Sequence, residues 1–266
     1  MLNEFADRRV IVTGAGRGIG AAIAAYFRGA GALVAAVDTQ FEESAESASA
    51  HNGPALIQIT ADLGRVEDLD LIVERCDAAL GGLDILVNCA AVYPVHPALD
   101  ISRDVWDRVL TINLTAPFLL AQGFARRLIA AGRPGHIVNI TSGNAERARA
   151  GAAHYCASKA GLELVSKTLA IEFAKHRIHV NAVSPGFIDT NSPVNPMPRE
   201  YIDAISATIP WPRLGEGDDI AKAVGFLCSS QAEWITGISL RVDGGRAAGN
   251  TSLPMATMSQ PATVPA

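Results

Sequence analysis

Short apolar runs alternate with longer amphipathic stretches along almost the whole chain, and this alternation is the strongest constraint on its fold. Apolar runs of strand length predict β-strands over residues 9–12, 32–37, 55–60, 84–88, 136–140, 178–183 and 238–242. Amphipathic stretches predict helices over residues 19–28, 66–80, 104–130, 153–175 and 219–229. Such a pattern is typical of a parallel sheet with helices on both faces. With right-handed crossovers, it predicts an α/β fold: a doubly wound parallel sheet, or Rossmann fold, of about seven strands.

A glycine-rich turn at residues 13–20, Thr-Gly-Ala-Gly-Arg-Gly-Ile-Gly, joins the first predicted strand to the first predicted helix. Glycines at such a turn let the backbone bend tightly and let a pyrophosphate approach the helix N-terminus. The alternative is a turn that binds nothing, but the strand–turn–helix context favours a ligand. We therefore expect the turn to contribute these dinucleotide-binding residues: Gly14, Gly16, Arg17, Gly18, Ile19 and Gly20.

Asp38 ends the second predicted strand, where a carboxylate can accept hydrogen bonds from both hydroxyls of an adenosine ribose. The same charge repels a 2′-phosphate, so Asp38 favours NAD over NADP. Arg17 favours NADP weakly, because its guanidinium can reach a phosphate. We expect Asp38 to determine the preference for NAD, since it occupies the ribose position itself.

Tyr155 and Lys159 are four residues apart in a predicted helix, so their side chains share one face. An ammonium beside a phenol favours phenolate and is expected to lower the tyrosine pKa. A tyrosine that exchanges a proton near neutral pH suits the interconversion of an alcohol and a carbonyl. Ser142 lies just after an apolar run.

Together these motifs resemble the short-chain dehydrogenase/reductase family over roughly residues 8–245. The resemblance is carried by the turn at 13–20, Asp62, Asn88-Cys89-Ala90-Ala91, Asn113, Ser142, Tyr155, Lys159 and Pro185-Gly186. It implies that Tyr155 is the general acid/base, and that Lys159 lowers its pKa and holds the nicotinamide ribose. It also implies that Ser142 binds the substrate oxygen and the developing alkoxide. Asn113 would hold a water that links Lys159 to solvent.

The resemblance also implies the remaining cofactor contacts. Asp62 and Leu63 would contact the adenine, and Ile188 and Thr190 the nicotinamide carboxamide. Further cofactor-binding positions would be Asn88, Ala90, Pro185 and Gly186. Ala91 replaces the glycine that the family usually has there, which is expected to crowd the cofactor slightly without abolishing binding.

Composition excludes several other functions. The net charge of −5 argues against a general nucleic-acid surface, and no apolar run approaches the ~20 residues of a membrane span. The four cysteines lie far apart and form no CxxC pair, which indicates reduced thiols and, with a charged N-terminus, a cytoplasmic protein. The six histidines show no metal-ligand spacing, so we expect no metal site.

The chain shows no repeat and no dividing linker, so residues 1–248 are predicted to form a single dinucleotide-binding and catalytic domain. A proline-rich substrate loop is predicted at about 186–213. Residues 249–266 lack periodicity and are predicted to be a flexible C-terminal tail.

Polar residues near the predicted reaction centre indicate a small polar substrate, such as a sugar, a polyol, a hydroxy acid or a sulfonate. The candidate substrate-binding residues are Tyr93, His96, Asn144, Arg147, Arg149, His154 and Asn191. An arginine among them can bind a carboxylate or sulfonate through two hydrogen bonds. The alternative for Arg147 and Arg149 is a surface or intersubunit ion pair.

The leading interpretation is therefore an NAD-dependent alcohol dehydrogenase. The alternatives are a dinucleotide-binding regulator without turnover, an NADP-dependent carbonyl reductase, and an epimerase or dehydratase. Apolar residues on more than one face of the two long predicted helices favour a homotetramer, or else a dimer.

Overall fold

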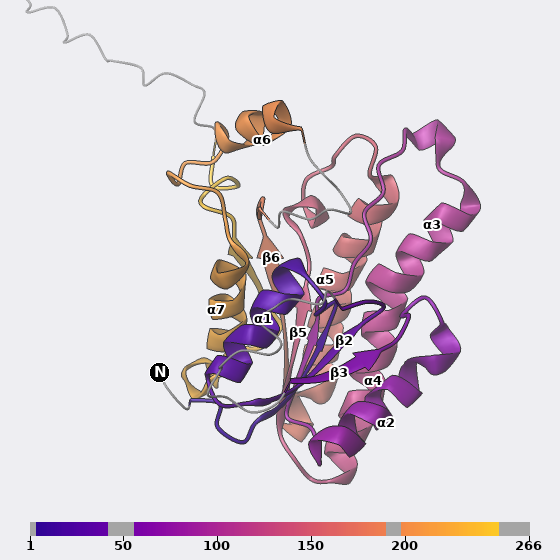
Figure 1. The fold of residues 1–266 in the computed structure, drawn as a ribbon, viewed down its shortest axis with the longest axis vertical. Helices are drawn as coiled ribbons and strands as arrows, with labels where there is room; N and C mark the ends of the chain where they lie inside the picture. Colours follow the sequence, from indigo (N-terminus) through magenta and orange to yellow (C-terminus); the bar gives the residue numbers. More distant parts are fainter. Residues whose placement is uncertain (1–3, 42–55, 190–197, 250–266) are drawn as a thin grey trace, which may run out of the picture.

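The computed structural model describes residues 4–41, 56–189 and 198–249 of the chain. It contains a seven-stranded parallel sheet in the order β3-β2-β1-β4-β5-β6-β7, which confirms the predicted doubly wound fold (Figure 1). The strands are β1 Arg9–Thr13, β2 Leu33–Asp38, β3 Leu56–Thr60, β4 Ile85–Asn88, β5 Gly135–Ile140, β6 Ile178–Pro185 and β7 Ser239–Val242. The strand order reverses between β1 and β4, so their carboxyl ends form the usual ligand-binding edge of such a sheet.

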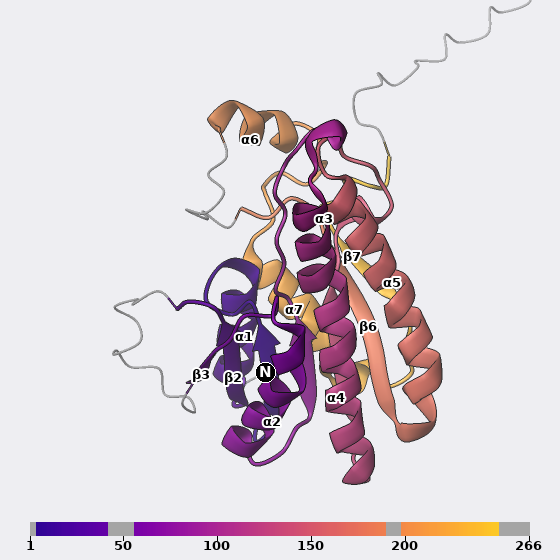
Figure 2. The same ribbon diagram turned by 90° about the vertical axis from the view of Figure 1, so that its right-hand side faces the viewer.

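Helices cover both faces of the sheet, as Figures 1 and 2 show. The α-helices are α1 Gly18–Gly29, α2 Leu69–Leu80, α3 Arg103–Leu110, α4 Ala116–Ala130, α5 Ala153–Phe173, α6 Arg199–Ser206 and α7 Gly217–Cys228. Helices α1 and α7 pack on one face, and α2, α4 and α5 pack on the other. Helix α6 lies apart from both layers, beyond one end of the sheet (Figures 1 and 2).

The core consists of two apolar layers, one on each face of the sheet. Strand β1 shows the division, because Val10 and Val12 face the α1/α7 layer while Ile11 faces the α2/α4/α5 layer. This follows from the two-residue period of a strand. All three side chains are at most 1% exposed, which explains why the strands read as continuous apolar runs.

Local sequence signals set several helix ends. Gly81 follows α2 in a left-handed conformation, with a φ of 70°. Ser102 precedes α3, and its side chain accepts a hydrogen bond from the N–H of Val105. Glu216 and Asp219 form a capping box at the start of α7. Asp219 also pairs with Arg213, and that hydrogen bond is the main reason its pKa falls to about 2.

Two elements differ from the sequence prediction. The helix predicted over 104–130 is divided into α3 and α4 by a π-helical turn at Thr111–Thr115. Pro117 is the signal that was missed, because it has no N–H to donate to the carbonyl of Asn113 four residues earlier. Helix α6 forms inside the predicted substrate loop, at residues 199–206. Residues 190–197 of that loop and 250–266 of the predicted tail lie outside the described residues.

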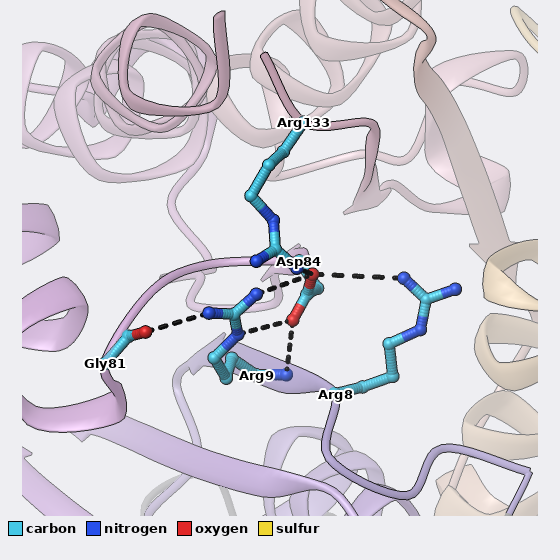
Figure 3. Close-up of polar contacts among 5 residues, drawn as sticks. All are labelled: Arg8, Arg9, Gly81, Asp84 and Arg133. Atoms are coloured by element: carbon cyan, nitrogen blue, oxygen red, sulfur yellow. Dashed lines mark hydrogen bonds and ion pairs between the residues drawn. The ribbon is translucent and has the colours of Figure 1, made fainter. Parts of the chain in front are cut away.

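A buried carboxylate ties together the end of the sheet opposite the carboxyl ends of its strands. Asp84 is 2% exposed and lies between three arginines, as Figure 3 shows. The side chain of Arg9 donates to it at 2.7 and 3.1 Å, and that of Arg133 at 2.6 Å. Burial alone would raise the pKa of Asp84, but the hydrogen bonds and charges of Arg9 and Arg133 outweigh burial and lower it. The cluster joins the start of β1 to the chain before β4 and β5.

The four cysteines are free thiols, as expected. Within the described ranges, no helix is both long enough and apolar enough to pass through a membrane.

Candidate active site

A single cavity of about 960 Å³ gathers most of the predicted site residues. It lies at the carboxyl ends of the strands, where the glycine-rich turn follows β1, Asp38 ends β2, and Ser142 follows β5. Chain segments that are far apart in sequence meet there because every strand of a parallel sheet ends at the same edge.

The glycine-rich turn needs its glycines for steric reasons. Gly14 has a φ of 68°, and a Cβ on it would lie 2.7 Å from the Cα of Ala90. A Cβ on Gly20 would collide with the carbonyl oxygen of Gly14. The turn therefore packs tightly against the chain after β4 and leaves the N-terminus of α1 facing the cavity. This geometry suits a pyrophosphate, which the backbone N–H groups can bind.

The carboxylate of Asp38 is fixed by backbone donors on both sides. Its Oδ2 accepts the N–H of Gly16 at 2.8 Å, and its Oδ1 accepts the N–H of Thr39 at 2.7 Å. Gly16 itself does not line the cavity, whereas Asp38 does, together with Asp62 and Leu63. These three residues can therefore contact an adenosine, as the sequence predicts.

Ser142, Tyr155 and Lys159 line the cavity together. The Ser142 side chain is an influence that lowers the pKa of the Tyr155 phenol. The Lys159 Nζ donates to the main-chain carbonyl of Ile140 at 2.8 Å and lies 5.8 Å from the centre of the Tyr155 ring. This bond fixes the face of α5 that carries Tyr155 and Lys159 to the end of β5, two residues before Ser142.

The pKa of Tyr155 differs from the sequence prediction. Burial raises it to about 12, and this effect exceeds the lowering by Ser142 and by the charge of Arg149. Burial also lowers the pKa of Lys159 to about 8. The expectation that Lys159 makes the Tyr155 phenol acidic is therefore wrong for the chain by itself. The Lys159 ammonium donates to the Ile140 carbonyl, and burial is the largest influence on the pKa of the phenol.

Asn113 and Asn88 point away from the cavity. The amide of Asn113 donates to the carbonyl of Val92 and accepts its N–H, both at 2.9 Å, and also donates to Ser158 at 3.2 Å. Asn88 donates to Asn139 at 2.8 Å and to the carbonyl of Pro117 at 3.3 Å. Neither side chain lines the cavity. Asn113 instead holds the chain segment that carries Tyr93.

The predicted substrate residues divide into three groups. Tyr93, Asn144, Arg147 and Arg149 line the cavity. His96 and His154 do not; His154 is fully buried, and its Nδ1 accepts the N–H of Tyr155 at 2.8 Å. Asn191 lies outside the described residues, as does Thr190 among the predicted cofactor contacts. The other predicted cofactor residues all line the cavity: Gly14, Arg17, Gly18, Ile19, Gly20, Ala90, Pro185, Gly186 and Ile188.

Several further lining residues were missed from the sequence, and Tyr201, Arg246 and Arg108 are among them. Tyr201 comes from α6, which was not predicted. Arg246 follows the last strand, and Arg108 lies in the last turn of α3. The sequence signal for Tyr201 was the helical pattern of residues 199–206. In that helix, Ile205 is the buried residue. Arg246 carries no local signal, because only the position of β7 beside β6 brings it to the cavity.

Comparisons with known proteins agree with this geometry. Residues 14–247 match the family model described as "Enoyl-(Acyl carrier protein) reductase". The chain is 36% identical to Nodulation protein G of Rhizobium meliloti (strain 1021) over 244 residues, which covers 92% of this chain and 98% of that protein.

Two solved structures are also similar. A 4-hydroxyisoleucine dehydrogenase complexed with NADH and succinate has a TM-score of 0.82 and 32% identity, and the match covers 90% of this chain and 100% of that one. The second structure, from Agrobacterium tumefaciens with bound NADP, is described as a candidate 2-deoxy-d-gluconate 3-dehydrogenase. Its TM-score is 0.84 with 35% identity, over 93% and 100% of the two chains. On the extent of these matches and on its site, the chain belongs to the short-chain dehydrogenase/reductase family, whose members bind a nicotinamide dinucleotide and act on alcohol-type substrates.

Proposed function

We propose that this protein is an NAD-dependent dehydrogenase that oxidises a secondary alcohol of a small polar molecule to the carbonyl. One observation carries the proposal: Ser142, Tyr155 and Lys159 line the same cavity as Asp38 and the glycine-rich turn. A proton-exchanging group and a dinucleotide-binding edge therefore share one cavity. Sugars, polyols, hydroxy acids and sulfonates are the substrate types that suit its polar lining.

The reaction divides between cofactor and protein. Bound NAD supplies the acceptor for the hydride that leaves the carbinol carbon. The Tyr155 phenolate takes the hydroxyl proton, so a C–H and an O–H bond break while the carbonyl forms. Ser142 donates a hydrogen bond to the alcohol oxygen and supports the alkoxide as it develops. Lys159 holds the ribose beside the nicotinamide and passes the proton from Tyr155 on toward solvent.

Asp38 is the reason for proposing NAD. Its carboxylate ends β2 and lines the cavity, where it accepts hydrogen bonds and repels a 2′-phosphate. Arg17 lines the same cavity and supports the alternative, an NADP-dependent carbonyl reductase. We weigh Asp38 more heavily because two backbone N–H groups already fix its position.

We also propose a homotetramer, with a dimer as the alternative, and a cytoplasmic location. The oligomer is supported by apolar side chains that α5 presents outward: Leu164 is 66% exposed and Ile171 80%. They are seven residues apart and therefore lie on one face of the helix. Burying such a stripe against a second copy is favourable.

Turnover tests the proposal. The purified protein is assayed with NAD and with NADP against a panel of secondary alcohols at alkaline pH, and NADH formation is expected with several polar members. Tyr155→Phe is expected to abolish most of this activity. Tyr26→Phe is the matched control, because Tyr26 packs against Phe5 and Phe27 away from the cavity. Binding of NAD without turnover of any alcohol would favour a non-catalytic regulator instead.

A further inference from the structure

Three arginines from two distant parts of the chain line the cavity. Arg147 and Arg149 belong to the segment between Ser142 and α5, and Arg246 follows β7. The two segments touch, because Nη1 of Arg147 donates to the main-chain carbonyl of Arg246 at 3.4 Å. The tertiary fold thus concentrates positive charge beside the residues proposed to bind the alcohol.

These charges are not neutralised by neighbouring carboxylates. Among the described residues, no ion pair involves Arg147, Arg149 or Arg246. The nearest acids along the chain are already engaged. Glu146 pairs with Arg241, and the carboxylate of Asp243 accepts the N–H groups of Gly245 and Ala247. Asp243 lines the cavity as well, and these backbone donors occupy its carboxylate.

Arg149 is also oriented toward the reaction centre. Its guanidinium carbon lies 5.8 Å from the centre of the Tyr201 ring, a cation–π contact that holds the planar group against α6. Its charge reaches Tyr155, because it is among the influences that lower the pKa of that phenol. A guanidinium can bind a carboxylate, sulfonate or phosphate through two parallel hydrogen bonds.

We propose that the alcohol substrate carries an anionic group, a carboxylate, sulfonate or phosphate, which Arg147, Arg149 and Arg246 bind while the carbinol carbon lies between Ser142 and Tyr155. This inference rests on the proposed dehydrogenase function and narrows its substrate class. Neutral polyols and apolar alcohols are then poor substrates, because they leave three guanidinium groups without a partner.

Matched pairs of alcohols test the inference. Gluconate is compared with sorbitol, 2,3-dihydroxypropane-1-sulfonate with 1,2-propanediol, and glycerol 3-phosphate with glycerol. In each pair that is turned over, kcat/KM is expected to favour the anion by at least about tenfold, the size of one charge-assisted hydrogen bond. The three pairs separate carboxylate, sulfonate and phosphate as the preferred group.

Variants test the assignment to these arginines. Arg149→Ala, Arg147→Ala and Arg246→Ala are each expected to reduce the anion-to-neutral ratio of kcat/KM by about 10- to 100-fold, mainly through a higher KM for the anion. Arg149→Lys is expected to recover part of the loss. Arg103→Ala is the matched control, because Arg103 is exposed on α3 and pairs only with Asp107. An increase in KM for NAD in place of KM for the substrate would assign the arginines to the cofactor and overturn the inference.

A binding experiment separates this inference from the dehydrogenase proposal. Inorganic sulfate is titrated into the protein by calorimetry, and binding is expected for the wild type and for Arg103→Ala but not for the triple alanine variant. Turnover of neutral alcohols with no preference for anions would refute the anion site and leave the dehydrogenase proposal standing. Sulfate binding that needs the three arginines, without turnover of any alcohol, would retain the anion site and refute the dehydrogenase.

Discussion

The carboxylate of Asp38 accepts the N–H of Gly16 at 2.8 Å, which joins the end of β2 to the glycine-rich turn after β1. A Cβ on Gly16 would overlap the carbonyl oxygen of Gln40 and lie 2.9 Å from Oδ2 of Asp38. Gly16 therefore supports the cofactor site by letting Asp38 approach, although it does not itself line the cavity. Asp38 is held where it can distinguish a ribose hydroxyl from a 2′-phosphate.

Asp38→Asn is expected to weaken the preference for NAD. The variant loses charge-assisted hydrogen bonds to the ribose, so kcat/KM with NAD should fall by roughly 10- to 100-fold. It also loses the repulsion of a 2′-phosphate, so kcat/KM with NADP should rise. Steady-state kinetics with both cofactors measure the change, and Asp107→Asn, an exposed carboxylate on α3, is the control. A wild-type enzyme that prefers NADP would contradict the role given to Asp38.

The rate of alcohol oxidation is expected to increase with pH through the alkaline range. Oxidation needs the phenolate of Tyr155, whose pKa burial raises to about 12, so its deprotonated fraction is small at neutral pH and increases about tenfold per pH unit. In Arg149→Ala this increase in rate should occur at higher pH, because the charge of Arg149 lowers the pKa of Tyr155. The measurement is kcat/KM for the alcohol from neutral to strongly alkaline pH. A flat profile would argue against Tyr155 as the base.

The loss of activity in Tyr155→Phe is expected to be about 10²- to 10⁴-fold, the usual contribution of a positioned general base. Ser142→Ala should retain more activity, because it removes one hydrogen bond and leaves the base in place. Single-turnover measurements with saturating NAD separate this loss from changes in binding. Equal activity of Tyr155→Phe and wild type would assign proton transfer to another group.

The fold, and the cavity lined by the glycine-rich turn, Tyr155 and Lys159, could be predicted from the sequence because both depend on local patterns. The period of the apolar residues gives the strands and helices, and the four-residue spacing of Tyr155 and Lys159 places both side chains on one face of α5. The turn at 13–20 is recognisable because its glycines sit between a strand and a helix.

The features that escaped prediction depend on tertiary contacts. The pKa of Tyr155 follows from how deeply the phenol is buried and from the bond of Lys159 to Ile140, and neither is visible in the spacing of the two residues. Arg246 reaches the cavity only because β7 pairs with β6. His154 was predicted to contact substrate but is buried against the backbone of Tyr155, since sequence proximity to a catalytic residue does not tell in which direction a side chain points.

Asp84→Asn is expected to lower the free energy of unfolding by about 3 kcal/mol, in the range for breaking a buried ion pair. The loss leaves Arg9 and Arg133 without their carboxylate at the end of the sheet that Figure 3 shows. Urea unfolding at neutral pH measures it. Asp107→Asn, which breaks an exposed pair with Arg103, should cost less than about 1 kcal/mol.

The contribution of Asp84 to the free energy of unfolding is also expected to depend on pH. Its pKa is lowered in the folded protein, so the folded state binds the proton less tightly than the unfolded state does. The stabilisation is therefore present above the unfolded pKa of about 3.9 and is lost as the pH falls through the lower, folded value. The difference in the free energy of unfolding between wild type and Asp84→Asn should then be constant from about pH 6 to 8 and shrink below about pH 4. A difference that grows on acidification would refute the lowered pKa.

Ile171→Glu and Leu164→Glu are each expected to reduce the molecular mass of the assembly. Both side chains project from the outer face of α5, which runs beside α4 in Figure 2. In a symmetric interface each substitution occurs twice, so it introduces two buried charges that repel each other. Light scattering during size-exclusion chromatography measures the mass, which should fall to that of a dimer or monomer. Leu99→Glu is the control, because Leu99 is 99% exposed on the loop between β4 and α3 and lies outside the stripe. A wild-type protein that is already monomeric at micromolar concentration would show that this apolar stripe faces solvent.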